Sequence, residues 1–184
     1  MSQKAKLRKK FLKIRQDKYF NINKKFFSPL LKLIRKRIKK KTTKIALYYP
    51  SNFELNVLKI LEEKFFLHQM ILLPVIEKNN LMKFYPWKKN EVLTVNKFGI
   101  LEPLKAKEKI PNVIIVPLLA FDEDKFRLGY GKGYYDRYLN KYLKQSKDIM
   151  TVGVAFSFQK HNKLPINKND VKLDFILTEK GIYK

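Results

Sequence analysis

One short run of residues constrains the fold of this chain more than any other feature. Residues 113–116, with the sequence VIIV, are wholly apolar and β-branched. Such a run is typical of a central strand in a parallel sheet, where both faces of the strand are buried. Similar apolar runs alternate with segments of helical spacing, which predicts an α/β domain with a largely parallel sheet. The expected strands are residues 44–49, 69–75, 82–87, 113–116, 151–156 and 173–178, and the expected helices between them are residues 53–66 and 132–145.

This topology also indicates where a ligand would bind. In open parallel sheets, ligands bind beyond the carboxyl ends of the strands. Functional residues are therefore expected in the loops that follow Tyr49, Val116, Phe156 and Leu177.

The first quarter of the chain is strongly basic and predicts two helices, residues 2–20 and 22–40, that form a hairpin. Residues 1–44 hold 18 Lys or Arg and a single acid, in a chain of net charge +25. This charge suits a polyanionic partner: a nucleic acid, a membrane surface or a phosphorylated small molecule. It also has a compositional explanation, because only 6 of the 41 basic residues are Arg, the residue on which nucleic-acid recognition usually depends.

Length and composition exclude several classes of protein. The 184 residues predict a single domain over residues 1–184, with residues 1–42 as its N-terminal helices. The absence of cysteine excludes a disulfide framework, a zinc ribbon and a thiol nucleophile. The longest apolar run, residues 113–121, contains Pro117 and is far shorter than the about 20 residues of a membrane-spanning helix. With no signal-peptide pattern at the N-terminus, we expect a cytoplasmic protein without a membrane partner.

The segment with the most chemical character is residues 121–136, FDEDKFRLGYGKGYYD. Gly129, Gly131 and Gly133 alternate just before a helical run, and such glycines let backbone N–H groups turn toward a ligand. The helix that follows adds a positive N-terminal end. Two cationic side chains and one carboxylate lie in or beside the turn, namely Arg127, Lys132 and Asp136.

Two interpretations of this glycine-rich turn stay open at this point. It could bind a nucleoside triphosphate with its metal ion, or it could simply lead a loop into a helix. The spacing does not match the Walker A pattern, because Gly133 follows Lys132 where that motif has Ser or Thr. It does not match the dinucleotide fingerprint either, because Tyr134 occupies the last glycine position.

Three further features have both a structural and a functional interpretation. Lys4 and Arg8 lie four residues apart, on one face of a helix that could be merely solvated. Glu54 follows the first expected strand and could serve as a helix N-terminal charge or as an acceptor for a heterocyclic ligand. The aromatic residues 84–87 could stack on a flat ring or belong to the core.

Several motifs occur in order along nearly the whole chain. They are RLGYGKGYYD at 127–136, the strand at 114–119 with Phe121 and Asp122, FYPW at 84–87, FGILEP at 98–103, VGVAF at 152–156 with Gln159, Leu164 and Pro165, Asn169 and Asp170 with Asp174, and Lys4, Leu7 and Arg8. Together they resemble the 5-formyltetrahydrofolate cyclo-ligase family, also called methenyltetrahydrofolate synthetase. The resemblance implies a three-layer α/β/α sandwich that closes 5-formyltetrahydrofolate to 5,10-methenyltetrahydrofolate, with ATP as co-substrate and Mg²⁺ as metal ion.

The resemblance also implies a role for individual residues. The residues implied in catalysis are Lys4, Arg8, Arg127, Lys132 and Tyr135. The ATP site would comprise Lys4, Arg8 and the loop Arg127, Leu128, Gly129, Tyr130, Gly131, Lys132, Gly133, Tyr134 and Tyr135. The folate would contact Tyr49, Glu54, Met82, Tyr85, Trp87 and Tyr135. Asp136 and Asp170 would bind Mg²⁺.

Two positions depart from the family pattern, and two other interpretations stay open. Lys125 stands where glycine is common, and Val57 stands where threonine is common. The chain could instead be a divergent ATP-dependent enzyme with another substrate, or a basic RNA-binding protein on the same fold. From the resemblance we expect a monomer that takes ATP and a folate, with or without additional glutamates, and no nucleic acid.

Overall fold

A mostly parallel sheet forms the centre of the molecule. The computed structural model describes residues 1–38, 42–146 and 148–184. The elements are α1 (Gln3–Asp17), α2 (Ser28–Arg37), β1 (Lys44–Ala46), β2 (Met70–Ile76), β3 (Met82–Pro86), β4 (Leu93–Val95), β5 (Leu101–Pro103), β6 (Val113–Val116), β7 (Ala120–Phe121), β8 (Arg127–Leu128), α3 (Tyr134–Tyr142), β9 (Met150–Val154), β10 (Phe175–Thr178) and β11 (Gly181–Tyr183). Short 3₁₀ helices cover Lys24–Phe27, Val57–Glu62, Lys64–His68, Lys78–Asn80 and Ser157–Gln159.

Seven strands make up the main sheet, in the order β11-β10-β9-β6-β1-β2-β3. The five strands from β10 to β2 are parallel to their neighbours, and only the edge strands β11 and β3 pair antiparallel. The VIIV run is the middle strand β6, and all four of its residues are buried. The predicted α/β class and largely parallel sheet are therefore confirmed.

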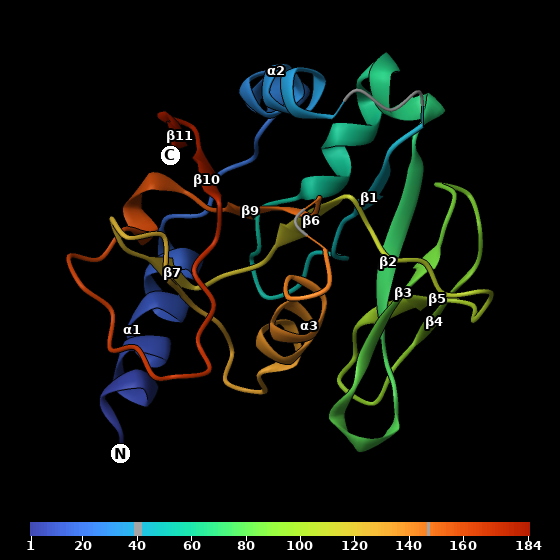
Figure 1. The fold of residues 1–184 in the computed structure, drawn as a ribbon. Coiled ribbons are helices and arrows are strands. Elements are labelled where there is room, and N and C mark those ends of the chain that lie inside the picture. The colour runs from blue at the N-terminus through green and yellow to red at the C-terminus, as the bar shows by residue number, and fades with distance from the viewer. Residues whose placement is uncertain (39–41, 147) are drawn as a thin grey trace.

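Apolar side chains cover both faces of this sheet, as expected for parallel strands. Val113 and Ile115 of β6 pack toward α2 and the 3₁₀ helices Val57–Glu62 and Lys64–His68. Ile114 and Val116 point to the opposite face and pack with residues of α3. Figure 1 shows α2 and α3 on opposite sides of the sheet.

The two N-terminal helices do not pair as the predicted hairpin. Phe11 of α1 packs beside β7 and β8, in a cluster with Leu119, Ala120, Leu128 and Leu164. α2 instead lies on the sheet face that carries Ile45 and Val113. The two helices are well separated in Figure 1. In the connection between them, Tyr19 and Phe20 pack against Phe156.

The expected helix over residues 53–66 is also wrong. The chain forms two 3₁₀ helices there, interrupted at Glu63 by an extended backbone with ψ of 125°. Asn52 and Phe53 have positive φ values of 46° and 60°, so the chain turns sharply where the helix was expected to begin. The expected α-helix of residues 132–145 is present but shorter, as α3. Residues 39 and 40 of the second expected helix lie outside the described residues.

Within the described ranges, no helix is both long and apolar enough to cross a bilayer.

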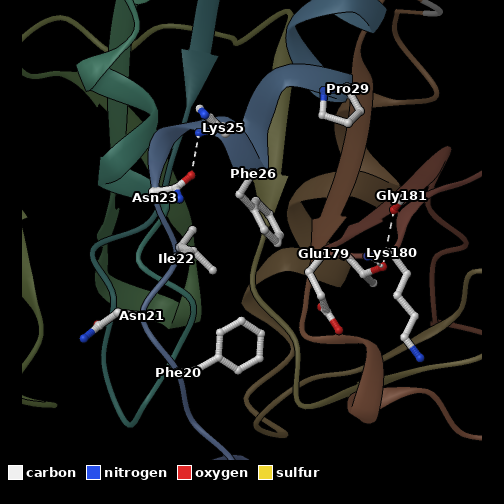
Figure 2. A pocket seen from close by; sticks show the side chains of 11 residues that line it. Phe20, Asn21, Ile22, Asn23, Lys25, Phe26, Pro29, Glu179, Lys180 and Gly181 are labelled. Atoms are coloured by element: carbon white, nitrogen blue, oxygen red, sulfur yellow. Dashed lines mark hydrogen bonds between the residues drawn. The ribbon is translucent and has the colours of Figure 1, made fainter.

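A hollow of about 490 Å³ opens between the segment after α1 and the turn that joins β10 to β11. Figure 2 shows Phe20 and Phe26 on one wall and Glu179 and Lys180 on the other. None of its lining residues was predicted for the functional site.

Candidate functional site

The candidate site lies where the connections of the sheet change direction. β2 pairs with one edge of β1, whereas β6 pairs with the other. At such a switch point, the loops that leave the carboxyl ends of the two strands diverge and create a crevice. The loop after β1 carries Glu54, and the loop after β6 carries Leu118. The side chain of Arg15 from α1 joins the two loops, because it donates to the carbonyl oxygens of Asn52 and Leu118.

The carboxylate of Glu54 is buried and held by three donors. Its Oε2 accepts hydrogen bonds from the backbone N–H of Ser51 at 2.9 Å and from the Ser51 hydroxyl at 3.3 Å. Its Oε1 accepts from the Tyr130 hydroxyl at 2.8 Å. Burial raises the pKa of Glu54, while these hydrogen bonds and the Arg15 charge oppose the rise. Arg15, Ser51, Glu54 and Tyr130 are called the Glu54 cluster below.

The glycine-rich turn requires glycine at two of its three glycine positions. Gly131 and Gly133 have φ values of +97° and +69°, which side-chain-bearing residues rarely adopt. A Cβ on Gly131 would also lie 3.0 Å from the Arg8 guanidinium carbon. No side chain caps the first turn of α3, so its N–H groups remain available at the end of the turn.

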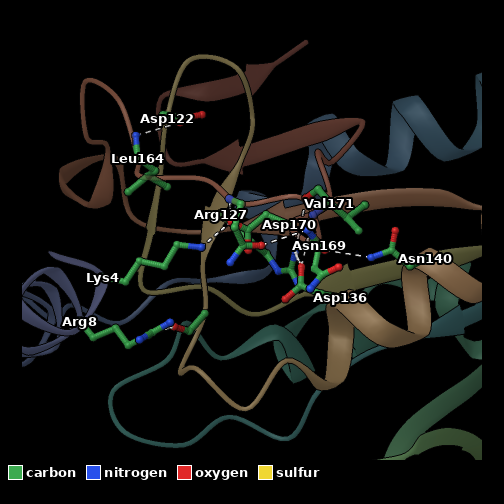
Figure 3. Close-up of polar contacts among 12 residues, drawn as sticks. Lys4, Arg8, Asp122, Arg127, Asp136, Asn140, Leu164, Asn169, Asp170 and Val171 are labelled. Atoms are coloured by element: carbon green, nitrogen blue, oxygen red, sulfur yellow. Dashed lines mark hydrogen bonds and ion pairs between the residues drawn. The ribbon is translucent and has the colours of Figure 1, made fainter. Parts of the chain in front are cut away.

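The first helix contacts this turn. Arg8 Nε donates to the Gly129 carbonyl oxygen at 2.8 Å. Lys4 lies one turn earlier and forms an ion pair with Asp170. These contacts join residues from opposite ends of the chain (Figure 3). The structure therefore brings Lys4 and Arg8 beside the predicted ATP loop.

Two carboxylates and two cations form a second cluster beside the turn. Arg127 Nη1 lies 3.0 Å from Asp136 Oδ1, and the same carboxylate oxygen accepts from the Val171 N–H at 3.4 Å. Asp170 accepts from the Asn167 N–H at 2.7 Å as well as from Lys4. Figure 3 shows these groups gathered between α1 and α3. Lys4, Arg127, Asp136 and Asp170 are called the Asp170 cluster below.

The side chains of the Asp170 cluster are of the types that bind Mg²⁺ and phosphate groups. Mg²⁺ is usually bound by one or two carboxylates, with phosphate oxygens and waters as the remaining ligands. Asp136 and Asp170 supply two such carboxylates, and among the described residues no larger group of metal-ligating side chains occurs. Each carboxylate is paired with a cation, so a bound metal ion would exchange places with Arg127 or Lys4. Gly129 leaves open space on its Cβ side, which suits close approach of a ligand to the turn.

Tyr135 lies between the two clusters. Burial raises the pKa of its hydroxyl, the Glu54 charge raises it further, and the Arg127 charge opposes the rise. Among the described residues, this buried hydroxyl finds no hydrogen-bond partner. A buried polar atom without a partner is costly, and a ligand group could supply the missing bond.

The remaining residues of the turn face a neighbouring hairpin. Lys132 Nζ lies 5.9 Å from the centroid of the Phe98 ring, and Phe98 also contacts Tyr134 edge-on. Phe98 lies between β4 and β5, in the FGILEP motif. Lys132 itself is exposed.

The aromatic residues predicted for the folate side are not gathered in one place. Met82 packs in the core beside α3, against which Tyr134 and Tyr135 also pack. Trp87 belongs to the core on the α2 face, and Tyr49 packs against that same core. The Tyr85 hydroxyl donates to Glu77 at 2.9 Å. Of the side chains predicted for the folate in this segment, Met82 shares a cluster with Tyr135, and so does the neighbouring Phe84, whose ring contacts Tyr135 edge-on.

Arg15 is the residue that the sequence prediction missed. It is 1% exposed and donates to Tyr130 of the turn as well as to the two loops. A signal for it exists: Lys4, Arg8, Phe11 and Arg15 follow the spacing i, i+4, i+7, i+11, which places them on one helical face. That face is the one that packs on the molecule, as the buried Phe11 shows.

The comparison with protein families decides the assignment. The model of the 5-formyltetrahydrofolate cyclo-ligase family matches residues 1–179. The chain belongs to this family. A relative from Haemophilus influenzae, named 5-formyltetrahydrofolate cyclo-ligase, is 32% identical over 140 residues, which are 72% of this chain and 74% of that protein. Members with this name are ligases.

A further relative and a solved structure agree with the assignment. A relative from Schizosaccharomyces pombe is 36% identical over 129 residues; the alignment covers 62% of this chain and 63%, just under two thirds, of the yeast protein. The NMR structure of 5,10-methenyltetrahydrofolate synthetase from Aquifex aeolicus has a TM-score of 0.76 and 33% identity, and the match covers 100% of this chain and 93% of that one. The fold is thus that of the synthetase over the whole chain.

Proposed function

We propose that this protein converts 5-formyltetrahydrofolate to 5,10-methenyltetrahydrofolate with consumption of ATP and release of ADP and phosphate. The observation that carries the proposal is the hydrogen bond from Tyr130 of the glycine-rich turn to Glu54. It joins the residue expected to bind the folate to the loop expected to bind ATP, at the switch point of the sheet. Family membership supplies the substrate, and the two clusters supply groups that suit it.

The reaction needs an activated leaving group. The formyl oxygen is a poor leaving group, so it first attacks the γ-phosphorus of ATP, and ADP leaves with the electron pair of the broken P–O bond. The nitrogen at position 10 then bonds to the formyl carbon and loses its proton. The C–O bond breaks, and phosphate leaves with its electron pair. Because the attack is intramolecular, holding the substrate in the right conformation supplies a large rate factor.

The residues of the site match these needs without a protein nucleophile. Lys4, Arg8, Arg127 and Lys132 would place positive charge around the transferring phosphoryl group. Glu54 would hold the folate ring by accepting hydrogen bonds from its N–H groups. The Tyr135 hydroxyl, which has no partner among the described residues, would donate to a ligand oxygen. Mg²⁺, held by Asp136 and Asp170, would neutralise charge on the phosphates.

The basic charge of α1 is partly explained by this proposal. Lys4, Arg8 and Arg15 lie on the face of α1 that packs on the molecule. Their side chains bond Asp170 and the carbonyl oxygens of Gly129 and Leu118, respectively. A cationic site would also raise the association rates of two anionic substrates. The proposal includes, as expectations from the sequence, a monomer in the cytoplasm.

A direct assay tests the proposal. The purified protein is mixed with 5-formyltetrahydrofolate, ATP and Mg²⁺, and the near-ultraviolet absorbance of the methenyl product is followed. A rise that requires all three additions is expected. If the folded protein binds ATP but produces no rise, the folate assignment is wrong, and other formylated or carboxylated substrates become the candidates. If it binds RNA with steep salt dependence and never turns over ATP, the enzyme proposal fails altogether.

A further inference from the structure

Arg15 is a buried cation to which the proposed reaction gives no role. It is 1% exposed, although taking a guanidinium out of water costs several kcal/mol unless it is well paired. Its Nη1 donates to the Leu118 carbonyl at 3.2 Å, and its Nη2 donates to the Asn52 carbonyl at 2.6 Å. The same Nη2 donates to the Tyr130 hydroxyl. One side chain thus joins the loop after β1, the loop after β6 and the glycine-rich turn.

The Tyr130 hydroxyl continues this connection to Glu54. It accepts from Arg15 and donates to Glu54 Oε1 at 2.8 Å, so the three side chains form one directed chain of hydrogen bonds. In this series of hydrogen bonds the Glu54 carboxylate is the counter-charge to Arg15, with the Tyr130 hydroxyl between the two charges. The hydrogen bonds in such a series polarise one another in a low-dielectric interior, so each bond strengthens the next.

Tyr130 depends on this chain for its position more than on packing. It is 40% exposed, and its neighbours in sequence are Gly129 and Gly131, which carry no side chains to hold it. The Arg15 guanidinium lies 5.6 Å from the centroid of its ring and adds a cation–π contact. A ligand that fixes the turn therefore also fixes the Tyr130 hydroxyl, from which Glu54 accepts a hydrogen bond. Conversely, a ligand that binds Glu54 fixes the turn through the same hydrogen bond.

We propose that Arg15 is a positioning residue that couples the two substrate subsites, so that ATP bound at the glycine-rich turn strengthens folate binding at Glu54, and the reverse. The inference rests on the proposed function, because it takes ATP and the folate as the two ligands. The ligand that binds first bears the loss of conformational entropy when the turn becomes ordered. The second ligand then binds to a turn that is already ordered. Linkage requires the two enhancements to be equal.

Calorimetric titration of the full chain tests the coupling. The dissociation constant of a non-hydrolysable ATP analogue with Mg²⁺ is measured with and without saturating 5-formyltetrahydrofolate. In the unchanged protein we expect binding to be about 10-fold tighter with the folate, within the usual range of such couplings. In Tyr130→Phe, which keeps the ring and loses the hydroxyl, the ratio should fall to about 1. Arg15→Lys should also lower the ratio, because one ammonium cannot serve three acceptors in the fixed geometry of a guanidinium.

Two matched variants separate coupling from stability. Tyr19→Phe removes a tyrosine hydroxyl that bonds Asn21 but keeps the ring that packs on Phe53, and should leave the ratio unchanged. Thr151→Val removes a buried hydroxyl that bonds Asp174 between β9 and β10, and should lower the melting temperature without changing the ratio. If Tyr130→Phe and Arg15→Lys lower only the melting temperature and keep the full ratio, Arg15 is structural and the inference is overturned.

A second measurement distinguishes failure of the inference from failure of the proposed function. If the unchanged protein binds the ATP analogue but no folate, the proposed function is wrong. Amide hydrogen exchange then tests whether the glycine-rich turn is connected to Glu54. The ATP analogue alone should slow exchange at the amides of residues 51–54, and Tyr130→Phe should remove that protection. Equal protection in both proteins contradicts the connection. If the unchanged protein binds neither ligand, both proposals fail.

Discussion

The two clusters of the site handle charge in opposite ways. In the Glu54 cluster the two charged side chains are shielded from water, with Glu54 7% and Arg15 1% exposed, while Tyr130 is 40% exposed. In the Asp170 cluster the side chains of Lys4, Asp170 and Asp136 are more open, at 21%, 18% and 25% exposure, whereas that of Arg127 is 4% exposed. The first cluster separates its two charges by a tyrosine hydroxyl, whereas the second pairs each cation directly with a carboxylate.

This difference indicates what each cluster is suited to bind. Buried hydrogen bonds hold the acceptor atoms of Glu54 in fixed positions, which suits recognition of a flat ring by geometry. The ion pairs of the Asp170 cluster keep part of their surface in solvent, so incoming charged ligands can compete for the paired groups. Under the proposed function, phosphates would take over the cations of the Asp170 cluster, while Mg²⁺ would take over its carboxylates. One cluster would thus be preorganised, and the other neutralised until its ligands arrive.

The largest expected effect comes from removing a cation that pairs with no carboxylate in the described part of the chain. Lys132→Ala should lower ATP-dependent turnover by about 10²–10³-fold, the usual cost of losing one group that stabilises developing charge. The fold should survive because Lys132 is exposed. Steady-state kinetics measures the effect, and Lys141→Ala, which removes an exposed lysine further along α3, is the control. Full activity in Lys132→Ala would remove this residue from the phosphate site.

A smaller and more selective effect is expected in the Glu54 cluster. Glu54→Gln should lower kcat/KM for the folate by about 10–100-fold, the range expected for losing hydrogen bonds to a charged group, and change the KM for ATP far less. Equal losses for both substrates would contradict the assignment of Glu54 to the folate.

The pH profile sharpens the same test. Burial raises the pKa of Glu54, so on acidification this carboxylate takes up its proton at a higher pH than an ordinary glutamate does. Folate use should therefore fall on the acid side above the usual glutamate range, and Glu54→Gln should lack this limb. The groups that face the carboxylate are Arg15, Ser51, Tyr48, Tyr130 and Tyr135. An identical acid limb in Glu54→Gln would assign the titration to another group.

The smallest expected effect concerns the backbone that carries Arg127 to the Asp170 cluster. Lys125 has a φ of 65°, in the left-handed region, where a side chain costs about 1–2 kcal/mol. Lys125→Gly should raise the free energy of unfolding by about 1 kcal/mol, because glycine's greater freedom in the unfolded chain offsets part of the gain. Denaturant unfolding measures it. Lys107→Gly, in a loop without positive φ, should bring no gain. A loss of stability in Lys125→Gly would contradict the strain.

The strands could be predicted from the sequence because burial on two faces leaves a local signature. The VIIV run, for example, became the middle strand with all four residues buried. Residues 53–66 misled the prediction, because their apolar spacing suits a helix while the sharp turn at Asn52 and Phe53 and the interruption at Glu63 leave only 3₁₀ turns. The hairpin of the first two helices failed for a similar reason: amphipathic spacing gives the buried face of each helix but not its partner.

The roles assigned to the site residues stay predictions, but the structure shows which of these residues lie together. Arg8 contacts the turn at residues 127–136 through the Gly129 carbonyl oxygen. Met82, Tyr85 and Trp87 are close in sequence, yet alternation along β3 sends Met82 to one face of the sheet and Trp87 to the other core. Arg15 looked like one basic residue among many, because its carbonyl partners at Asn52 and Leu118 exist only in the folded chain.

The ion pair between Lys4 and Asp170 has a consequence for how the protein is made. It joins residues 166 positions apart, so one partner is synthesised long before the other. A nascent chain can form α1 early, but the Asp170 cluster stays incomplete until residue 170 has left the ribosome. A chain that stops between the glycine-rich turn and Asp170 would thus carry the turn without the carboxylate that pairs with Lys4.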